Sequence, residues 1–236
     1  MKKVILKLEK INFSIRGNVT NRGNVTKNKI FHILKDVSIE IKDRSVVGIL
    51  GNNGSGKSTL LKIIMGILPH NDGKITNFCK NIKLLTLTSG FDHNLSGREN
   101  TIISGMLYGQ SKLEIESKIN QIHQYSELRE YFFMPISTYS TGMLSRLGFA
   151  IAITIPTDLL LIDETLSVGD ISFRKKTEKS IKDKLDNGMS AILISHSLPQ
   201  LEALCDEIYI LNKGRIINHG ESSDMINYYK KHEQSN

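Results

Sequence analysis

Alternating hydrophobic and polar residues occur in two segments near the N-terminus of the chain. Val4–Glu9 and Val37–Ile41 alternate as strands with one buried face do, and Asn12–Ile15 is a further extended run. Between them, residues 16–27 hold a tandem copy of six residues that reads Arg-Gly-Asn-Val-Thr followed by Asn or Lys. Its glycines and asparagines predict a lengthened surface loop. Near the C-terminus, a hairpin is expected about Asn212–Gly214.

The pattern then changes to continuous apolar runs separated by helical periodicity. Residues 46–50, 159–162 and 191–194 form apolar runs, which are typical of strands buried on both faces of a parallel sheet. Apolar residues recur at helical spacing over 60–68, and a charged amphipathic helix is predicted near 171–187. This alternation of strands and helices predicts an α/β fold with a parallel sheet.

Helical periodicity without a strand pattern fills the middle of the chain. Helices are predicted near residues 97–109, 112–128 and 142–154. We therefore expect one domain over residues 1–236. In it, a helical subdomain of residues 89–153 is inserted into a core formed by residues 1–88 and 154–236.

Composition and charge exclude several classes of protein. Hydrophobic residues make up 39% of the 236 positions and charged residues 23%, as in a globular chain rather than a disordered one. No apolar run approaches the roughly 18 residues of a membrane-spanning helix, and we expect no signal peptide. Cys79 and Cys205 are far apart, which excludes a disulfide scaffold and fits a reducing cytosol. The formal charge of +7 is scattered along the chain, so we expect no nucleic-acid binding.

A glycine-rich turn between a predicted strand and a predicted helix carries the first candidate site. Gly51–Ser58 reads Gly-Asn-Asn-Gly-Ser-Gly-Lys-Ser, which fits the G-x-x-x-x-G-K-[ST] pattern of a phosphate-binding loop. The glycines allow tight turns that direct N–H donors at one point, and the helix N-terminus adds positive charge. Lys57 would reach the β- and γ-phosphates, and the Ser58 hydroxyl would coordinate Mg²⁺. The predicted nucleotide-binding residues here are Gly51, Asn52, Asn53, Gly54, Ser55, Gly56, Lys57, Ser58 and Thr59.

Two carboxylates follow the apolar run that ends at Ile162. Asp163 and Glu164 lie at the C-terminal end of this predicted strand, where open α/β sheets bind ligands. Asp163 would hold Mg²⁺ directly or through water, and Glu164 would polarise the attacking water. An apolar run followed by acids is a weak signal alone, and it becomes specific together with the glycine-rich loop.

A third motif resembles the signature of a known family. Tyr139–Met143, just before a predicted helix and about 20 residues ahead of Asp163, resembles the signature motif of ATP-binding cassette (ABC) proteins. The resemblance implies that Ser140 and Gly142 contact the γ-phosphate of ATP held by an opposing subunit. By the same resemblance, Asp170 belongs to the D-loop and His196, after a strand, is the switch histidine. It also implies a P-loop NTPase core with an N-terminal antiparallel β-subdomain and an inserted helical signature subdomain.

Longer runs narrow the resemblance to one branch of the family. Residues 139–150, 163–173 and 89–100 are similar to the ATPases that export O-antigen, capsular polysaccharide and teichoic acid. Two features depart from the usual family pattern. No glutamine stands between Leu84 and Asn94, where most members have the Q-loop residue. The aromatic residue that would stack on adenine is also open: Phe31 is our candidate, with His32 and Phe13 as alternatives.

The resemblance implies an ATPase that acts as a homodimer. Two ATP molecules would lie between the glycine-rich loop of one subunit and the signature motif of the other, with Lys57, Glu164 and His196 as catalytic residues. A separate membrane permease would be required, and the chain would lie peripherally on the cytoplasmic face of the cell membrane. Because the sequence has no long extension after Asn236, we expect no C-terminal carbohydrate-binding domain of the kind that some members carry.

Two other functions stay open at this point. The chain could be the ATPase subunit of an exporter for another cargo, such as a drug, a peptide or a lipid. It could also be a soluble ABC protein that acts on ribosomes or DNA. Such proteins usually have two cassettes in tandem or a long coiled-coil insertion, and this sequence has neither.

Overall fold

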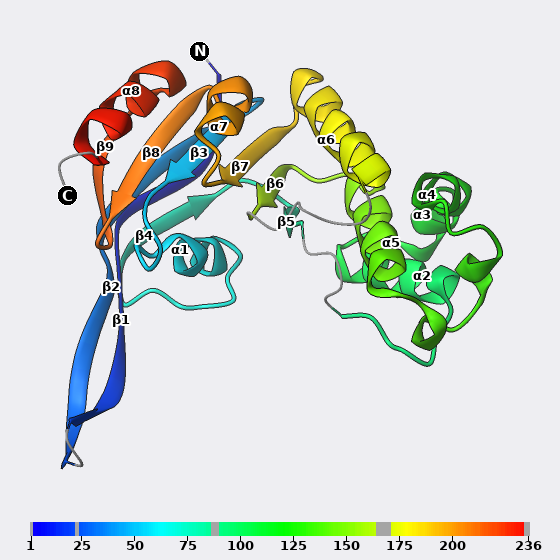
Figure 1. Ribbon diagram of the computed structural model, residues 1–236, viewed down its shortest axis with the longest axis horizontal. Helices are drawn as coiled ribbons and strands as arrows, with labels where there is room; N and C mark the ends of the chain where they lie inside the picture. The colour runs from blue at the N-terminus through cyan, green and yellow to red at the C-terminus, as the bar shows by residue number, and fades with distance from the viewer. Residues whose placement is uncertain (1, 22–23, 86–89, 164–170, 234–236) are drawn as a thin grey trace. The chain divides into compact units, whose positions relative to one another are not determined.

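The computed structural model describes residues 2–21, 24–85, 90–163 and 171–233 (Figure 1). The chain forms two compact units. Unit 1 comprises residues 1–79 and 190–236, and unit 2 comprises residues 80–189. The predicted helical subdomain lies within unit 2, which also contains the predicted strand at 159–162.

An antiparallel sheet forms one layer of unit 1. Its strands are β1 (Val4–Asn21), β2 (Asn24–Lys42) and β4 (Asp72–Asn77), in the order β2-β1-β4. Alternate side chains such as Leu6 and Leu8 are buried, as the sequence pattern predicts. This sheet confirms the expected N-terminal antiparallel β-subdomain.

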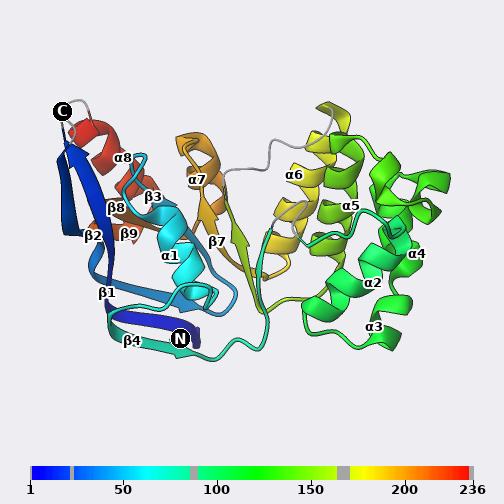
Figure 2. The ribbon, with the colours of Figure 1, turned by 90° about the horizontal axis from the view of Figure 1, so that it is seen from below.

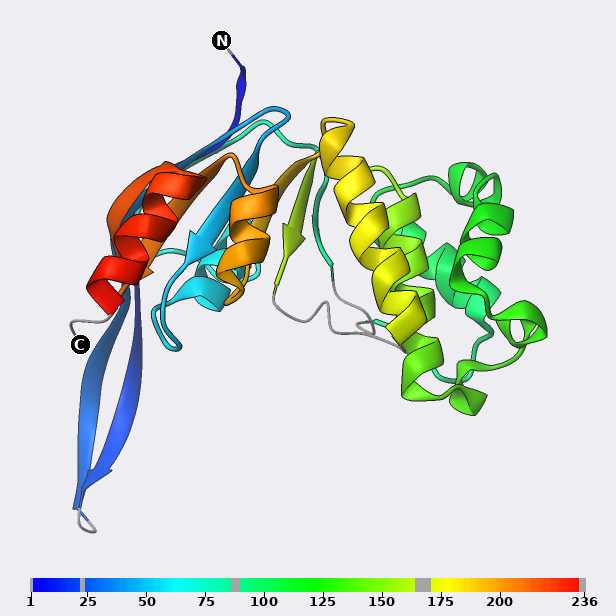
Figure 3. The ribbon, with the colours of Figure 1, turned by 45° about the horizontal axis from the view of Figure 1, so that its top comes forward.

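A mostly parallel group of strands forms the second layer of unit 1. Strand β3 (Val46–Leu50) lies between β7 (Ser190–Ile194) and β8 (Glu207–Asn212), and pairs in parallel with both. All residues of β3 and β7 are buried, so their continuous apolar runs are explained by cover on both faces. Strand β9 (Arg215–Glu221) pairs antiparallel with β8. The helices of unit 1 are α1 (Lys57–Ile64), α7 (Leu198–Leu204) and α8 (Ser222–Glu233), and α8 packs along β8 and β9 (Figure 3).

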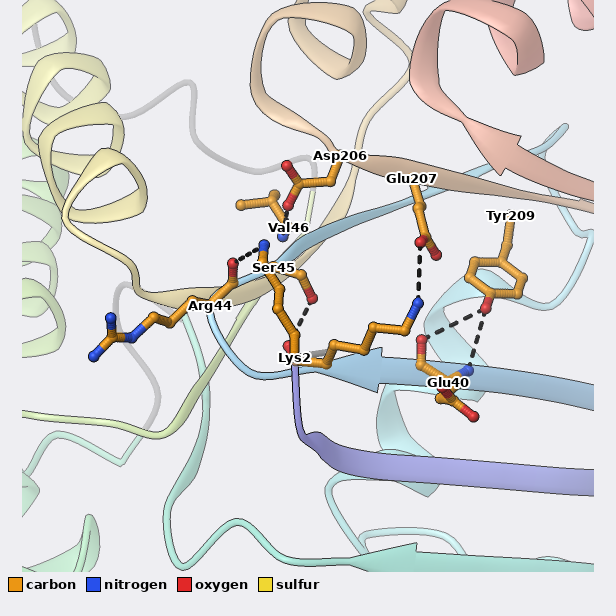
Figure 4. Close-up of polar contacts among 9 residues, drawn as sticks. Lys2, Glu40, Arg44, Ser45, Val46, Asp206, Glu207 and Tyr209 are labelled. Atoms are coloured by element: carbon orange, nitrogen blue, oxygen red, sulfur yellow. Dashed lines mark hydrogen bonds and ion pairs between the residues drawn. The ribbon is translucent and has the colours of Figure 1, made fainter.

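Polar contacts join the two layers of unit 1 (Figure 4). The Tyr209 hydroxyl on β8 lies 3.3 Å from the amide nitrogen of Glu40, which donates to it, and 3.5 Å from the Glu40 carbonyl oxygen. At the start of β3, the amide of Val46 donates to the Asp206 carboxylate at 2.9 Å. The Tyr209 contacts hold β8 against β2, and the Val46 bond fixes the start of β3, which leads to the glycine-rich loop.

The β8–β9 connection confirms the predicted hairpin. Asn212 pairs with Arg215, and the two residues between them, Lys213 and Gly214, have φ angles of 46° and 82°. Two successive positive φ angles define a type I′ turn, whose twist matches that of paired strands. The turn is therefore tight, and its tip contacts the glycine-rich loop.

Unit 2 combines a short pair of parallel strands (Figure 1) with helices, most of which are labelled in Figure 2. Strand β5 (Ile82–Leu84) pairs with β6 (Leu159–Ile162). The helices confirm the sequence prediction, except that the predicted helix 112–128 is divided at residues 117–118. They are α2 (Gly97–Leu107), α3 (Lys112–Glu116), α4 (Ile119–Ser126), η1 (Arg129–Phe133), η2 (Ile136–Thr138), α5 (Thr141–Thr154) and α6 (Ile171–Asp186). Among the described residues of the whole chain, no helix is both long and apolar enough to cross a membrane.

The prediction of a loop over residues 16–27 is wrong. The described residues of the repeat belong to strands β1, which ends at Asn21, and β2, which begins at Asn24, and these strands pair through Val19↔Thr26 and Thr20↔Val25 (Figure 1). The end of the first copy thus pairs with the second copy, whereas Gly17 pairs with Lys29, which lies outside the repeat. The preference of glycine and asparagine for a loop is outweighed by the β1–β2 pairing, which is already established where the repeat begins.

Deleting one copy of the repeat, residues 22–27, should leave the fold intact. Strand β1 pairs with β4 only as far as Asn12, and Val25 and Thr26 of the deleted copy pair with β1 rather than with the rest of the sheet. Shortening a connection changes the closure free energy by about 0.6 kcal/mol, or roughly 2 °C in melting temperature. Thermal unfolding followed by circular dichroism measures this change. A fall of more than about 5 °C would show that the outer hairpin supports the sheet.

Candidate functional site

The glycine-rich loop connects β3 to α1 and has no space for larger residues at two points. A Cβ atom on Gly51 would collide with the carbonyl oxygen of Leu211. Gly56 has a φ angle of 111°, and a Cβ there would lie 2.7 Å from the side chain of Leu34. The first glycine is therefore required by close packing, and the last by both conformation and packing.

The loop closes around the side chain of Lys57. This side chain is 8% exposed, and its ammonium donates to the carbonyl oxygens of Gly51 at 2.6 Å and Asn52 at 3.0 Å. The hydroxyl oxygen of Ser55 is buried and has no hydrogen-bond partner in the described part of the chain. A buried cation and an unpaired hydroxyl at the start of α1 form a cradle that fits an anionic ligand such as a phosphate chain.

The outer side of the loop is open. Asn52, Asn53, Gly54 and Ser58 are exposed, and Thr59 is half-buried. The N-terminus of α1 has no acidic residue in its first turn, which leaves the positive end of the helix dipole uncompensated there. The residues predicted from the motif thus lie together on one strand–loop–helix segment, and the Ser58 hydroxyl is accessible to a metal ion.

Two segments distant in sequence support the loop. The amide of Gly214, at the tip of the β8–β9 turn, donates to the Ser55 carbonyl oxygen at 3.0 Å. The Tyr229 hydroxyl on α8 donates to the Asn52 side chain at 2.8 Å. Sequence reasoning missed both residues because their partners lie far away along the chain and no motif spacing connects them.

His196 follows the C-terminal end of β7 and is exposed, as expected of a residue that meets a ligand at a strand end. Hydrogen bonds of the Ser195 side chain hold the residues on both sides of His196. The Ser195 hydroxyl donates to the Gln200 side chain at 2.8 Å and accepts from the amide of Ser197 at 3.1 Å. The backbone on both sides of His196 is therefore fixed by hydrogen bonds.

In unit 2, Asp163 follows β6 and is half-buried. The burial of all residues of β6 confirms the strand that the apolar run predicts. Glu164 and Asp170 lie outside the described residues, as do residues 86–89 of the segment in which a Q-loop residue would stand. Their assignments stay predictions from the sequence.

The signature motif begins helix α5. Ser140 is the N-cap residue, and its hydroxyl accepts from the amide of Met143 at 3.3 Å. The atom nearest to a Cβ built on Gly142 is the Ser140 hydroxyl oxygen, at 3.8 Å. The chain itself therefore has space for a side chain at Gly142, and both residues lie at an exposed or half-exposed helix N-terminus. A glycine at this position suits the close approach of a ligand from outside.

A second glycine explains how the signature is held in place. A Cβ on Gly97, the first residue of α2, would collide with the hydroxyl of Tyr139, the residue before the N-cap. That hydroxyl donates to the Tyr131 carbonyl oxygen at 2.6 Å, and burial raises the pKa of Tyr139 to about 12. The Leu-Ser-Gly-Arg-Glu-Asn run thus packs against the signature segment. Within it, Ser96 and Glu99 form a capping box that starts α2.

An ion network links α5 to α6 through Glu127, the residue that ends α4. The Glu127 carboxylate accepts from Lys176 on α6 at 2.5 Å and from Arg146 on α5 at 3.0 Å. The pKa of Glu127 is lowered, first by the hydrogen bond from Lys176 and then by the charges of Lys176 and Arg146. The Arg146 guanidinium also lies 4.8 Å from the centre of the Phe173 ring. These contacts join α5 to α6, and no sequence motif indicated them.

The three candidate aromatics differ in exposure. Phe13 is 9% exposed and belongs to the core, whereas Phe31 is 37% exposed on β2. The Lys29 ammonium lies 5.6 Å from the centre of the Phe31 ring. His32 is exposed and pairs with Ser14 across the hairpin. The Phe31 ring is thus accessible to a ligand, while that of Phe13 is committed to packing.

Comparison with protein families and curated proteins gives consistent matches. The model of the ABC transporter family matches residues 34–167. The teichoic acids export ATP-binding protein TagH of Lactiplantibacillus plantarum is 38% identical over 89% of this chain and 58% of that protein. The O-antigen export system ATP-binding protein RfbB of Klebsiella pneumoniae is 33% identical over 87% of this chain and 83% of that protein. The ABC transporter protein AbcA of Aeromonas salmonicida is 34% identical, and this chain spans 66% of its length.

Solved structures share the fold. The structure of an ATP-binding subunit of an ABC transporter has a TM-score of 0.76 and 21% identity, and covers 96% of this chain and 93% of its own. The cassette MJ0796, a dimer bound to ADP and Pi, has a TM-score of 0.73 and 19% identity over 92% of this chain and 99% of its own. The expected α/β fold with a P-loop NTPase core is therefore confirmed.

Replacing Gly97 by Ala should destabilise the protein, whereas replacing Gly142 by Ala should not. The first change forces Tyr139 to move and costs about 1–3 kcal/mol, or roughly 3–10 °C in melting temperature. The second has space for its methyl group and gains helix propensity. Thermal unfolding of the two variants measures the difference. Equal melting temperatures would contradict the packing of Gly97 against Tyr139.

Proposed function

This chain belongs to the ABC transporter family, and we propose that it is the ATP-hydrolysing subunit of an exporter that moves a lipid-linked polysaccharide across the cytoplasmic membrane. The loop between β3 and α1 carries this proposal. There a buried ammonium, a buried unpaired hydroxyl and the N-terminus of a helix face the same short segment. Such a segment is built to bind the phosphate chain of a nucleotide.

Each residue of the loop has a proposed task. The Lys57 ammonium exchanges its bonds to Gly51 and Asn52 for bonds to the β- and γ-phosphates. Backbone N–H groups of Asn53 to Thr59 donate to phosphate oxygens, which Gly54 and Gly56 permit through positive φ angles of 76° and 111°. Phe31 is the proposed stacking partner of the adenine ring.

Hydrolysis needs a metal ion and a base. Ser58 is the proposed Mg²⁺ ligand of unit 1, and Asp163 is that of unit 2, since hydroxyl and carboxylate oxygens suit this ion. When bound, Mg²⁺ neutralises charge on the β- and γ-phosphates. Glu164 would take a proton from the water that attacks the γ-phosphorus, and His196 would stabilise the charge on the γ-phosphoryl group as ADP leaves.

We propose a homodimer with two shared sites. Ser140 and Gly142 would bind the γ-phosphate of ATP held by the second subunit, with the N-terminus of α5 directed at it and Asp170 at the interface. The space at Gly142 supports this arrangement, because a Cβ there would meet no described atom closer than the Ser140 hydroxyl at 3.8 Å. A dimeric cassette among the solved structures of the same fold also supports it.

The proposed cargo and partners are based on the relatives that match this chain. Proteins named for teichoic acid and O-antigen export match most of this chain, although it spans only 58% of the length of one TagH protein and 45% of another. We propose a separate membrane permease as the partner, a position at the cytoplasmic face of the membrane, and no role for nucleic acid. Isolation of the chain with a polymer-exporting permease would separate this function from export of a drug, peptide or lipid.

Replacing Lys57 by Ala should weaken ATP binding by roughly a hundredfold, because the buried cation at the phosphates supplies several kcal/mol. Lys62→Ala is the matched control, since Lys62 lies on the exposed side of the same helix. Titration with a fluorescent ATP analogue measures both affinities. Wild-type affinity in the Lys57 variant would refute the assignment of the loop.

Replacing Glu164 by Gln should leave ATP binding intact and slow hydrolysis by about 10²–10⁴-fold, because the amide cannot accept the proton from water. Uncleaved ATP should then hold two subunits together, and adding Ser140→Arg should separate them by obstructing the interface. Size-exclusion chromatography with light scattering measures the mass with Mg-ATP present. Turnover at the wild-type rate would defeat the role of Glu164, and a monomer at saturating ATP would count against the shared sites.

A further inference from the structure

Lys83, on the short strand β5, is a buried cation. Its side chain is 2% exposed, and within the described ranges no carboxylate forms an ion pair with it. Lysine is among the residues least often buried without such a partner, because removing an ammonium from water is costly. None of the motifs of the chain includes this position, so its burial requires a separate explanation.

The Lys83 ammonium contacts the ends of two helices. It donates to the carbonyl oxygens of Ile155 at 3.1 Å and Ala152 at 3.5 Å, both at the C-terminal end of α5. It also lies 4.4 Å from the centre of the ring of Tyr108, the residue that ends α2. Two carbonyl oxygens and one aromatic face give three acceptors, which match the three N–H donors of an ammonium.

The end of α5 needs donors that its own backbone does not supply. The last carbonyls of a helix have no intrahelical partner, and amides that follow the helix usually close them. Here the residue after the C-cap Ile155 is Pro156, which has no N–H. Lys83 supplies the donors from a neighbouring strand, and its charge is favourable at the negative end of the helix dipole.

We propose that Lys83 is a positioning residue for ATP hydrolysis, whose ammonium fastens the signature helix to the strand pair that leads to Asp163. Lys83 stands opposite Leu160 of β6, the strand that ends at Ile162, and α5 begins at the signature residue Ser140. Within unit 2, one side chain thus connects the element that carries the signature to the element that carries the proposed metal ligand. This inference rests on the proposed function.

The link between the Lys83 ammonium on β5 and the end of α5, here called the tie, depends on the protonation of Lys83 and therefore on pH. Burial is the first cause that lowers the pKa of Lys83 to about 7, and the positive charges of Lys184 on α6 and Lys118 before α4 add to it. The other group facing the ammonium is the Tyr108 ring. A neutral amine has fewer donors and no cation–π attraction, so the tie weakens as the pH rises through about 7.

The decisive variant is Lys83→Met, which keeps an unbranched side chain only one atom shorter and removes the charge. An unfolded lysine stays protonated to about pH 10, so burying this ammonium costs stability below pH 7, and the cost declines as the pH rises above 7. The variant should therefore melt at or above the wild-type temperature at pH 6.5 and yet hydrolyse ATP more slowly. We expect kcat to fall roughly tenfold with KM nearly unchanged, because small misplacements of catalytic elements reduce turnover. Lys80→Met, an exposed lysine just before β5, is the matched control and should behave as the wild type.

The pH profile separates positioning from simple packing. Wild-type kcat should carry a decline through about pH 7 that Lys83→Met lacks. Lys83→Arg, which stays charged at every pH used, should also lack the decline and keep more activity than the Met variant. A Met variant with wild-type kcat and a wild-type pH profile would overturn the proposal.

Hydrogen exchange tests the tie without ATP hydrolysis. In Lys83→Met, amides at the end of α5 should exchange several-fold faster than in the wild type, while Lys80→Met should leave them unchanged. If the wild-type protein hydrolyses no ATP but this exchange pattern is found, the proposed function fails and the tie stands. Unchanged exchange in the Met variant would refute the tie whatever the ATPase activity.

Discussion

The close packing of the glycine-rich loop against the β8–β9 hairpin is the constraint on which the candidate site depends. The backbone of Gly51 meets the Leu211 carbonyl oxygen where no side chain fits, and the Gly214 amide donates to Ser55 from the same hairpin. These contacts hold the loop in a curved form in which Lys57 can turn back onto it. A backbone fixed in this way presents its N–H groups without first losing conformational freedom, which favours binding of a phosphate chain.

The signature helix shows a similar division between fixed and open parts. Its N-terminus is exposed, and Gly142 there has free space around it, whereas Tyr139 just before it is locked against Gly97. It is joined to α6 through Glu127, and its C-terminal end is held by Lys83. Since a helix of 14 residues is about 21 Å long and stiff, contacts at its far end also set the place of Ser140. The N-terminus that would meet a ligand is thus accessible, while the rest of the helix is held by contacts with neighbouring segments.

The repeat near the N-terminus shows how composition and pairing can conflict. Glycine and asparagine favour turns as isolated residues, so the repeat suggested a loop. Val19 and Thr20 in the first copy nevertheless pair with Val25 and Thr26 in the second. Because the strands are already joined at Ile15 and Phe31, each further pair extends an existing ladder and needs no new nucleus. The register of a preformed sheet therefore decided the structure of a segment whose composition alone favoured a loop.

The sequence by itself determined the elements whose signals are local. Apolar runs predicted β3, β6 and β7, the Asn-Lys-Gly turn predicted the β8–β9 hairpin, and the motif Gly51–Ser58 located the strand–loop–helix segment of the site. These features depend on backbone conformation and burial within a few residues, which composition and spacing record directly. Only the tertiary structure revealed Tyr229 at Asn52, Gly97 beneath Tyr139, and Lys83 at the end of α5. Each of these contacts joins segments that are separated by many residues along the chain. Such a contact forms only when folding brings the two segments close together in space, and a local pattern of residues carries no information about that distance.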